Sequence, residues 1–242
     1  MTRHTSASIK LSVYRNGGRA AIASGVAGIL SIAFLIFYLG LRSSRPDDGL
    51  LMNRIFDMGL AIQYLLWIPL ASALQKLSQK RPPGIRQLGL DVGIGAICFV
   101  ILYHLLIFPG LVSDILYMIP QGVFGVWLIF VSTRLKGMIP GGLRWLGMIA
   151  GLGLALVGIF PIGFAIFVDP MPVQIPPGPP KEFPNTTANS ILHQLLFIGS
   201  IMGVLTLPVW TILTGRRLLQ LSGGMSSPVY VALTEQLSRQ NR

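Results

Sequence analysis

Charged residues and cysteine are both scarce in this sequence. Only 11% of its 242 residues are charged, with eight acidic residues against nineteen basic ones. Soluble domains carry about 25% charged residues, so this chain lacks the charge for a surface that faces water. A hydrophobic content of 52% excludes a disordered chain. The single cysteine, Cys98, excludes a secreted scaffold held together by disulfides.

The apolar residues are gathered into runs long enough to cross a membrane. A helix needs about twenty apolar residues to span a hydrocarbon layer of roughly 30 Å. Six windows meet this length: Ala20 to Leu41, Ile55 to Leu74, Leu88 to Phe108, Leu111 to Ser132, Leu143 to Val168, and Ile191 to Thr214. None alternates apolar and polar residues as the strands of a membrane barrel do. The sequence therefore predicts an all-α, polytopic bundle of six transmembrane helices.

The basic residues predict the orientation of this bundle. If the six spans are correct, all but four of the nineteen Lys and Arg residues fall on one side, the exceptions being Arg42, Arg45, Arg54 and Lys181. Lys and Arg are enriched in cytoplasmic loops, so both termini are predicted to be cytoplasmic. An odd number of helices would break this pattern. The net charge of +11 then indicates contact with anionic lipid headgroups, and it does not indicate nucleic-acid binding.

Three segments flank or interrupt the predicted transmembrane domain, residues 20–214. A basic arm, residues 1–19, precedes it, and a cytoplasmic tail, residues 215–242, follows it. In the tail, Ser227-Pro228 followed by apolar residues at helical spacing predicts a short amphipathic helix. The outer loop 169–190 is rich in proline, which favours an extended strap.

A few polar residues in or beside the spans are candidates for function. An ionisable side chain is expensive in lipid and is by default a functional hypothesis. In the predicted topology most of these residues lie in the outer half of the bundle, and some share helix faces with tyrosines, because Asp57 and Tyr64 are seven residues apart and Tyr117 and Gln121 are four apart. The predicted ligand site or transport path consists of Asp57, Gln63, His104, Asp114, Gln121 and His193.

Each candidate also has a simpler structural explanation. Asp57, Asp91 and Asp114 each fall near the start of a predicted span, where a carboxylate can cap the helix and face the positive end of its dipole. His193 suits the membrane interface, and His104 suits a hydrogen bond to a neighbouring helix.

No catalytic site is predicted. His104 and His193 lie at one predicted depth, so they are candidate ligands for haem or, together with an aspartate, for a transition metal. The sequence has no G-x-S-x-G nucleophile motif, and Cys98 in the middle of an apolar run suits packing.

Small residues at a spacing of four predict close helix contacts. Two such faces occur, one made of Gly147, Gly151 and Ala155 and the other of Ala20, Ser24 and Gly28. Small side chains let helix backbones approach closely in membranes. The spacing is compatible with contacts within one chain or between two chains.

The stretch Gln121 to Ile159 resembles part of a family of uncharacterised bacterial multi-spanning membrane proteins, a domain of unknown function. The likeness rests on a basic helix end, the turn at Ile139-Pro140, and the Arg144-Trp145-Leu146-Gly147 element that opens a Gly-rich helix. The resemblance implies an integral membrane protein of six or seven helices and carries over no catalytic residues.

These observations lead to three functional hypotheses for a multi-pass protein of the bacterial inner membrane. The first is a binding, sensing or accessory component without enzyme activity. The second is a small transporter or channel subunit with a polar path in the outer half of the bundle. The third is a haem- or metal-binding redox protein that uses His104 and His193. A homo-oligomer or another membrane protein is a possible partner in each case.

Overall fold

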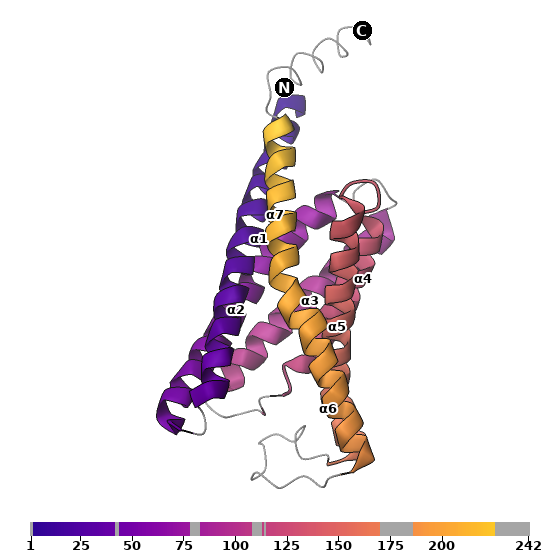
Figure 1. The fold of residues 1–242 in the computed structure, drawn as a ribbon. Helices are drawn as coiled ribbons and strands as arrows, with labels where there is room; N and C mark the ends of the chain where they lie inside the picture. Colours follow the sequence, from indigo (N-terminus) through magenta and orange to yellow (C-terminus); the bar gives the residue numbers. More distant parts are fainter. Residues whose placement is uncertain are drawn as a thin grey trace.

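The computed structural model describes residues 2–41, 44–77, 83–107, 113, 115–169 and 186–225, and within them it forms helices and no β-strand. Figure 1 shows long helices that run up and down the molecule. The elements are α1 (Thr2–Leu41), α2 (Pro46–Leu77), α3 (Pro83–Ile107), α4 (Met118–Arg134), α5 (Gly141–Phe167), α6 (Thr187–Ser200), a π-helical turn η2 (Ile201–Leu205) and α7 (Thr206–Met225). The prediction of an all-α chain is confirmed for this part of the sequence.

Five helical segments are long and apolar enough to cross a membrane, as expected of a multi-pass membrane protein. They are Ser12–Leu41, Leu51–Leu77, Gly89–Ile107, Gly141–Phe167 and Thr187–Gly223. The predicted span 111–132 differs most from the structure, because α4 begins only at Met118 and has 17 residues. Turns occupy residues 115–117, so this segment is shorter as a helix than its apolar run suggests.

The helices extend beyond the apolar windows at the chain ends. Helix α1 has 40 residues and begins at Thr2, within the predicted arm 1–19. Helix α7 continues past the predicted end of the last span to Met225. Hydropathy marks the residues that suit lipid, whereas a helix can continue through polar residues into water. The predicted amphipathic tail helix and residues 170–185 of the proline-rich loop lie outside the described residues.

Helix α3 lies between two groups of helices and contacts one helix of each. Helix α1 packs against α2 and α7, α4 packs against α5, and α5 packs against α6, while α3 contacts α2 and α4. The last helix joins the two groups, since its α6 part lies on α5 and its α7 part lies on α1 (Figure 1). The change of partner occurs at η2, as is common for π-helical turns at bends. Its Gly203 lies against the backbone of Gly153 in α5.

The small residues make contacts within the chain. A Cβ atom at Gly158 would overlap the backbone of Gly122, and one at Gly151 would overlap the carbonyl oxygen of Gly125, so α4 and α5 touch through their backbones. On α1, a Cβ atom at Gly28 would collide with the Gln63 side chain of α2. The Ser24 hydroxyl donates a hydrogen bond of 3.1 Å to the Gln63 carbonyl. These faces therefore hold neighbouring helices together.

An aromatic layer fills the centre of the bundle. It consists of Trp67, Phe124, Trp127 and Trp210, all buried. The Trp67 ring lies edge-on to Phe124 at 4.7 Å between centroids and is stacked on Trp210 at 5.5 Å. The Trp210 Nε1 group donates a hydrogen bond of 2.9 Å to the carbonyl of Leu143. Because rings from α2, α4 and α7 meet here, this layer connects the two groups of helices.

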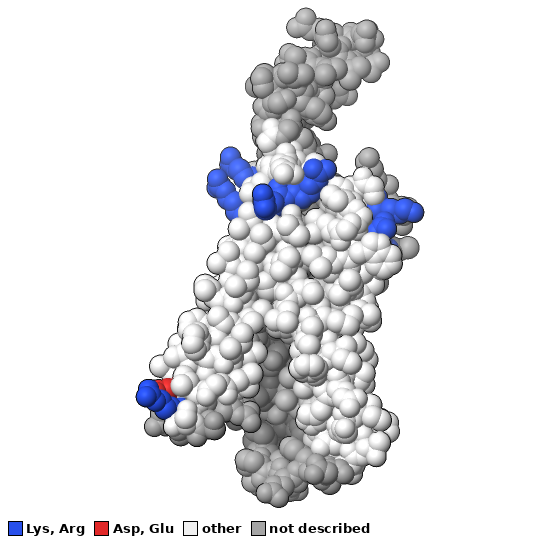
Figure 2. Space-filling view, viewed as in Figure 1, with Lys and Arg blue, Asp and Glu red and all other residues white. Residues whose placement is uncertain are grey.

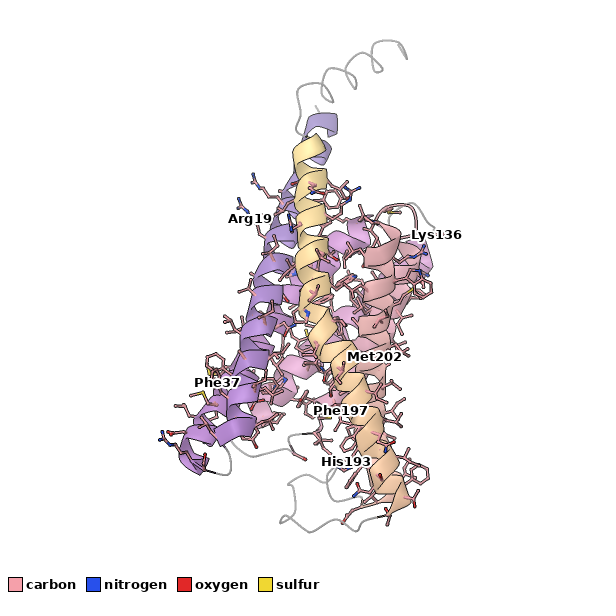
Figure 3. The ribbon with its side chains drawn as sticks, viewed as in Figure 1. Arg19, Phe37, Lys136, His193, Phe197 and Met202 are labelled. Carbon is pink, nitrogen blue, oxygen red and sulfur yellow. The ribbon has the colours of Figure 1, made fainter. Side chains whose placement is uncertain are left out.

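Basic side chains gather toward the end of the bundle where the described parts of α1 begin and α7 ends. Figure 2 shows the blue side chains on this face mainly as a band at that end, and Figure 3 labels Arg19 and Lys136 within it. The opposite end has Arg45, which is 3.9 Å from Asp48 in an exposed pair. We call the first end the basic end.

Candidate functional site

Helices α2 and α3 bring Asp57 and His104 together. Oδ1 of Asp57 lies 3.7 Å from Nδ1 of His104, and the exposed fractions of the two side chains are 17% and 1%. Asp57 lies in the first half of α2, and His104 lies in the last turn of α3. Both residues are therefore in the half of the bundle remote from the basic end.

Aromatic and amide groups extend this pair. The Tyr117 ring, in the turn before α4, lies 4.4 Å from the His104 ring between centroids. The buried Tyr64 hydroxyl lies near the side chain of Gln121 and near Tyr117. We call these five residues, Asp57, Tyr64, His104, Tyr117 and Gln121, the polar cluster. Its members share helix faces because Tyr64 follows Asp57 by two helical turns and Gln121 follows Tyr117 by about one.

Several atoms of the polar cluster are buried without a hydrogen-bond partner. They are both ring nitrogens of His104, the hydroxyl of Tyr64 and Oε1 of Gln121. A buried polar group that lacks a partner costs about 1 to 3 kcal/mol. Stability alone would favour apolar side chains at these buried positions. The polar cluster is therefore a candidate for binding or proton uptake.

The aromatic layer closes the polar cluster toward the basic end. Tyr64 is edge-on to Phe124 at 5.6 Å between centroids, and Trp67 and Phe124 follow Tyr64 and Gln121 by about one helical turn. Phe124 and Trp67 are fully buried. The five residues of the polar cluster therefore lie in one half of the bundle.

Gln63 does not belong to the polar cluster. It is buried, but its side chain lies against Gly28 of α1 and close to Pro208 of α7. Adjacent positions on a helix point about 100° apart, which is why Gln63 and Tyr64 face different neighbours.

His193 is also separate from the polar cluster. It is exposed on α6, its Nδ1 lies 2.9 Å from the carbonyl oxygen of Asn189, and its ring is edge-on to Phe160 of α5. Figure 3 shows it near the end of α6 that is remote from the basic end. His104 contacts α2 and Tyr117 instead, so the geometry gives no support to a ligand shared by the two histidines. Among the residues with described placement, no three His, Cys, Asp or Glu side chains are close enough to hold a metal ion.

The capping explanation is wrong for two of the three aspartates. Helix α2 begins at Pro46 and α3 begins at Pro83, so Asp57 and Asp91 lie several turns and about two turns inside their helices, respectively. Asp91 is exposed. Both helices start earlier in the sequence than the apolar windows do, so neither residue lies at a helix start. Asp114, the third aspartate, lies outside the described residues.

Tyr64 and Tyr117 join the site although they were not among the predicted site residues. Their spacing from Asp57 and Gln121 was the available signal, because it placed them on the same helix faces. A tyrosine in an apolar run is usually a packing residue, and only the arrangement of α2, α3 and α4 shows that these two rings meet polar groups.

This chain matches no protein-family model, no curated protein and no solved structure. The resemblance of Gln121 to Ile159 to a bacterial membrane family therefore carries no functional argument, and function has to be argued from the geometry.

Proposed function

We propose that this chain is a multi-pass protein of the bacterial inner membrane that crosses the bilayer six times and has both termini in the cytoplasm. Helix α4 is short for a full crossing, but it packs along α5 and its end carries Arg134. The gathering of basic side chains at the end where α1 starts and α7 ends supports this orientation.

Cysteine labelling tests the orientation. Cys98, the single cysteine, is replaced by alanine, and one cysteine is then introduced at an exposed position on either end, as Arg45→Cys or Lys136→Cys. A maleimide that cannot cross membranes should label intact cells with Arg45→Cys and leave Lys136→Cys unlabelled, while permeabilised cells show both. The reverse pattern on intact cells would contradict the orientation.

We further propose that the protein is a sensing component that responds to proton uptake by the Asp57–His104 pair. The observation that carries this proposal is a carboxylate 3.7 Å from Nδ1 of an imidazole whose two nitrogens are buried and accept or donate no hydrogen bond. Histidine is the side chain that changes charge most readily between about pH 5 and 8. A proton on His104 would create an ion pair with Asp57 in a buried site. Charges interact strongly where water is excluded, so the electrostatic energy that holds α2 and α3 together there would change.

Sensing is favoured over transport because the aromatic layer separates the polar cluster from the basic end. A transport path needs exchangeable polar groups at several depths. The fully buried rings of Trp67 and Phe124 occupy the next level toward the basic end. They also provide the means of response, since Tyr64 of the polar cluster touches Phe124 directly.

Tryptophan fluorescence tests this role in the full-length protein. Three of the four tryptophans belong to the aromatic layer, so a change at His104 should alter their emission. We expect wild type in nanodiscs to show a reversible emission change between about pH 8 and about pH 4. The change should be lost in His104→Phe and kept in His193→Phe, which removes an exposed histidine. Equal pH profiles in wild type and His104→Phe would contradict the proposal.

Proteoliposomes separate the sensing role from the transport alternative. With a pH gradient and a pH-sensitive dye inside the vesicles, a sensing protein should give the proton flux of empty vesicles. A flux that depends on His104 would replace sensing by a proton path through the bundle.

A further inference from the structure

We propose that a groove at the basic end, between the start of α5 and the end of α7, binds the phosphate headgroup of an anionic phospholipid. The groove has a volume of about 330 Å³. One part of its lining is apolar and consists of Leu143, Leu146 and Leu213. The other part is basic or polar and consists of Arg216, Arg217 and Gln220. Among the residues that the structure describes, no acidic side chain lines it. This site is distinct from the polar cluster and does not depend on the sensing role.

The two arginines supply the positive charge. Arg216 is exposed, and Arg217 is half-buried with its Nη1 donating a 3.4 Å hydrogen bond to Oε1 of Gln220. The Nε atom of Arg217 is buried and has no hydrogen-bond partner. Arginine offers several N–H donors in a planar fork that suits phosphate oxygens. The Arg217 side chain thus lines the groove with its Nη1 group held by Gln220.

The first turn of α5 adds a second attraction for an anion. This helix begins at Gly141 after Pro140, no side chain caps it, and its first turn has no acidic residue. The N–H groups at a helix start have no partners within the helix, and they lie at the positive end of its dipole. Pro140 and Gly142 are both part of the groove lining. The helix start and the arginines therefore act on the same space.

The apolar side of the groove distinguishes a lipid from a soluble anion. Leu143 and Leu146 of α5 and Leu213 of α7 line it, and Leu213 is 40% exposed. A soluble phosphate would leave these side chains uncovered, whereas the glycerol and acyl part of a phospholipid would cover them. Basic pockets between transmembrane helices at a membrane surface are typical sites for anionic headgroups.

Lipid titration by native mass spectrometry of the full-length protein in detergent tests this proposal. The probes are phosphatidylglycerol, phosphatidylcholine and soluble glycerol phosphate. The variant is Arg216→Gln with Arg217→Gln. The control is Arg15→Gln with Arg19→Gln, which removes the same charge from exposed positions near the same height, since Gly18 of α1 lies against Gly215 of α7.

Wild type and the control should bind one phosphatidylglycerol more tightly than phosphatidylcholine, and the variant should bind it about tenfold more weakly. Circular dichroism should show the same helix content in all three proteins, and Leu213→Ala should weaken binding of phosphatidylglycerol without a change of charge. Equal loss in variant and control would reduce the site to a general charge effect and overturn the proposal. Displacement of the lipid by equimolar glycerol phosphate would show an anion site without lipid specificity, which would also overturn it.

Discussion

The polar cluster and the aromatic layer share helices α2 and α4, where they lie about one turn apart, yet they differ in how many of their buried polar atoms have hydrogen-bond partners. In the aromatic layer, rings fill the space and the Trp210 Nε1 group donates a hydrogen bond to a carbonyl. Only the Nε1 atom of Trp67 in this layer is buried without a hydrogen-bond partner. In the polar cluster, both nitrogens of His104 and the buried oxygens of Tyr64 and Gln121 lack partners. The same backbone arrangement therefore serves stability in one layer and leaves unused hydrogen-bonding capacity in the next.

The largest effect is expected from removing a ring of the aromatic layer. Trp67→Ala deletes a fully buried side chain that touches three other rings. The free energy of unfolding should fall by about 3 to 5 kcal/mol, as for other buried aromatic residues. Reversible unfolding in mixed micelles measures it. Trp145→Ala, at a tryptophan that is 57% exposed, is the matched control and should cost much less. Similar losses would mean that the layer is not the stabilising centre.

A smaller loss is expected from overfilling the aromatic layer. A Cβ atom at Gly93 of α3 would collide with the Trp127 ring, whereas nothing lies within 4 Å of one at Gly95. Gly93→Leu should therefore lower the free energy of unfolding by about 1 to 3 kcal/mol, and Gly95→Leu should leave it nearly unchanged. The two variants are compared in the same micelle unfolding measurement. Equal tolerance of both would show that the space beside Trp127 can expand.

The polar cluster should respond in the opposite way to the loss of its histidine. His104→Phe removes two buried nitrogens without partners and keeps a ring of similar size, so the free energy of unfolding should stay the same or rise by about 1 kcal/mol. The pH response of the tryptophan emission should disappear in the same protein. A loss of several kcal/mol would identify His104 as a residue that stabilises the fold.

The smallest effect is expected at His193, the histidine of α6. His193 is exposed and bonds only within its own helix turn, besides its contact with Phe160. His193→Ala should change the free energy of unfolding by no more than about 0.5 kcal/mol and leave the pH response intact. A large effect on either quantity would extend the site to α6.

The sequence could predict the helices better than their ends. Hydropathy located the apolar segments, because burial in lipid depends mainly on composition. It could not locate the starts of α2 and α3, because a helix that continues beyond lipid obeys local propensity and capping instead. This difference displaced Asp57 and Asp91 from the predicted helix starts.

The candidate site was predicted in part for a similar reason. The position of a residue within its predicted span gives its expected depth. For Asp57 and His104 these expected depths were the same. Which side of a helix meets which neighbour depends on packing between helices that are distant in sequence. Gln63 therefore faces α1 and His193 faces α5, while Tyr64 and Tyr117 complete the polar cluster.

Histidine NMR in nanodiscs measures proton uptake by the Asp57–His104 pair itself. The chain has three histidines, so variants assign the ring nitrogen signals of His104 and His193. We predict that the His104 ring gains a proton reversibly as the pH falls from about 8 to about 4. We also predict that Asp57→Asn changes the pH of this step without altering that of His193. A His104 signal that stays constant over this range, or that is indifferent to Asp57→Asn, would contradict the account.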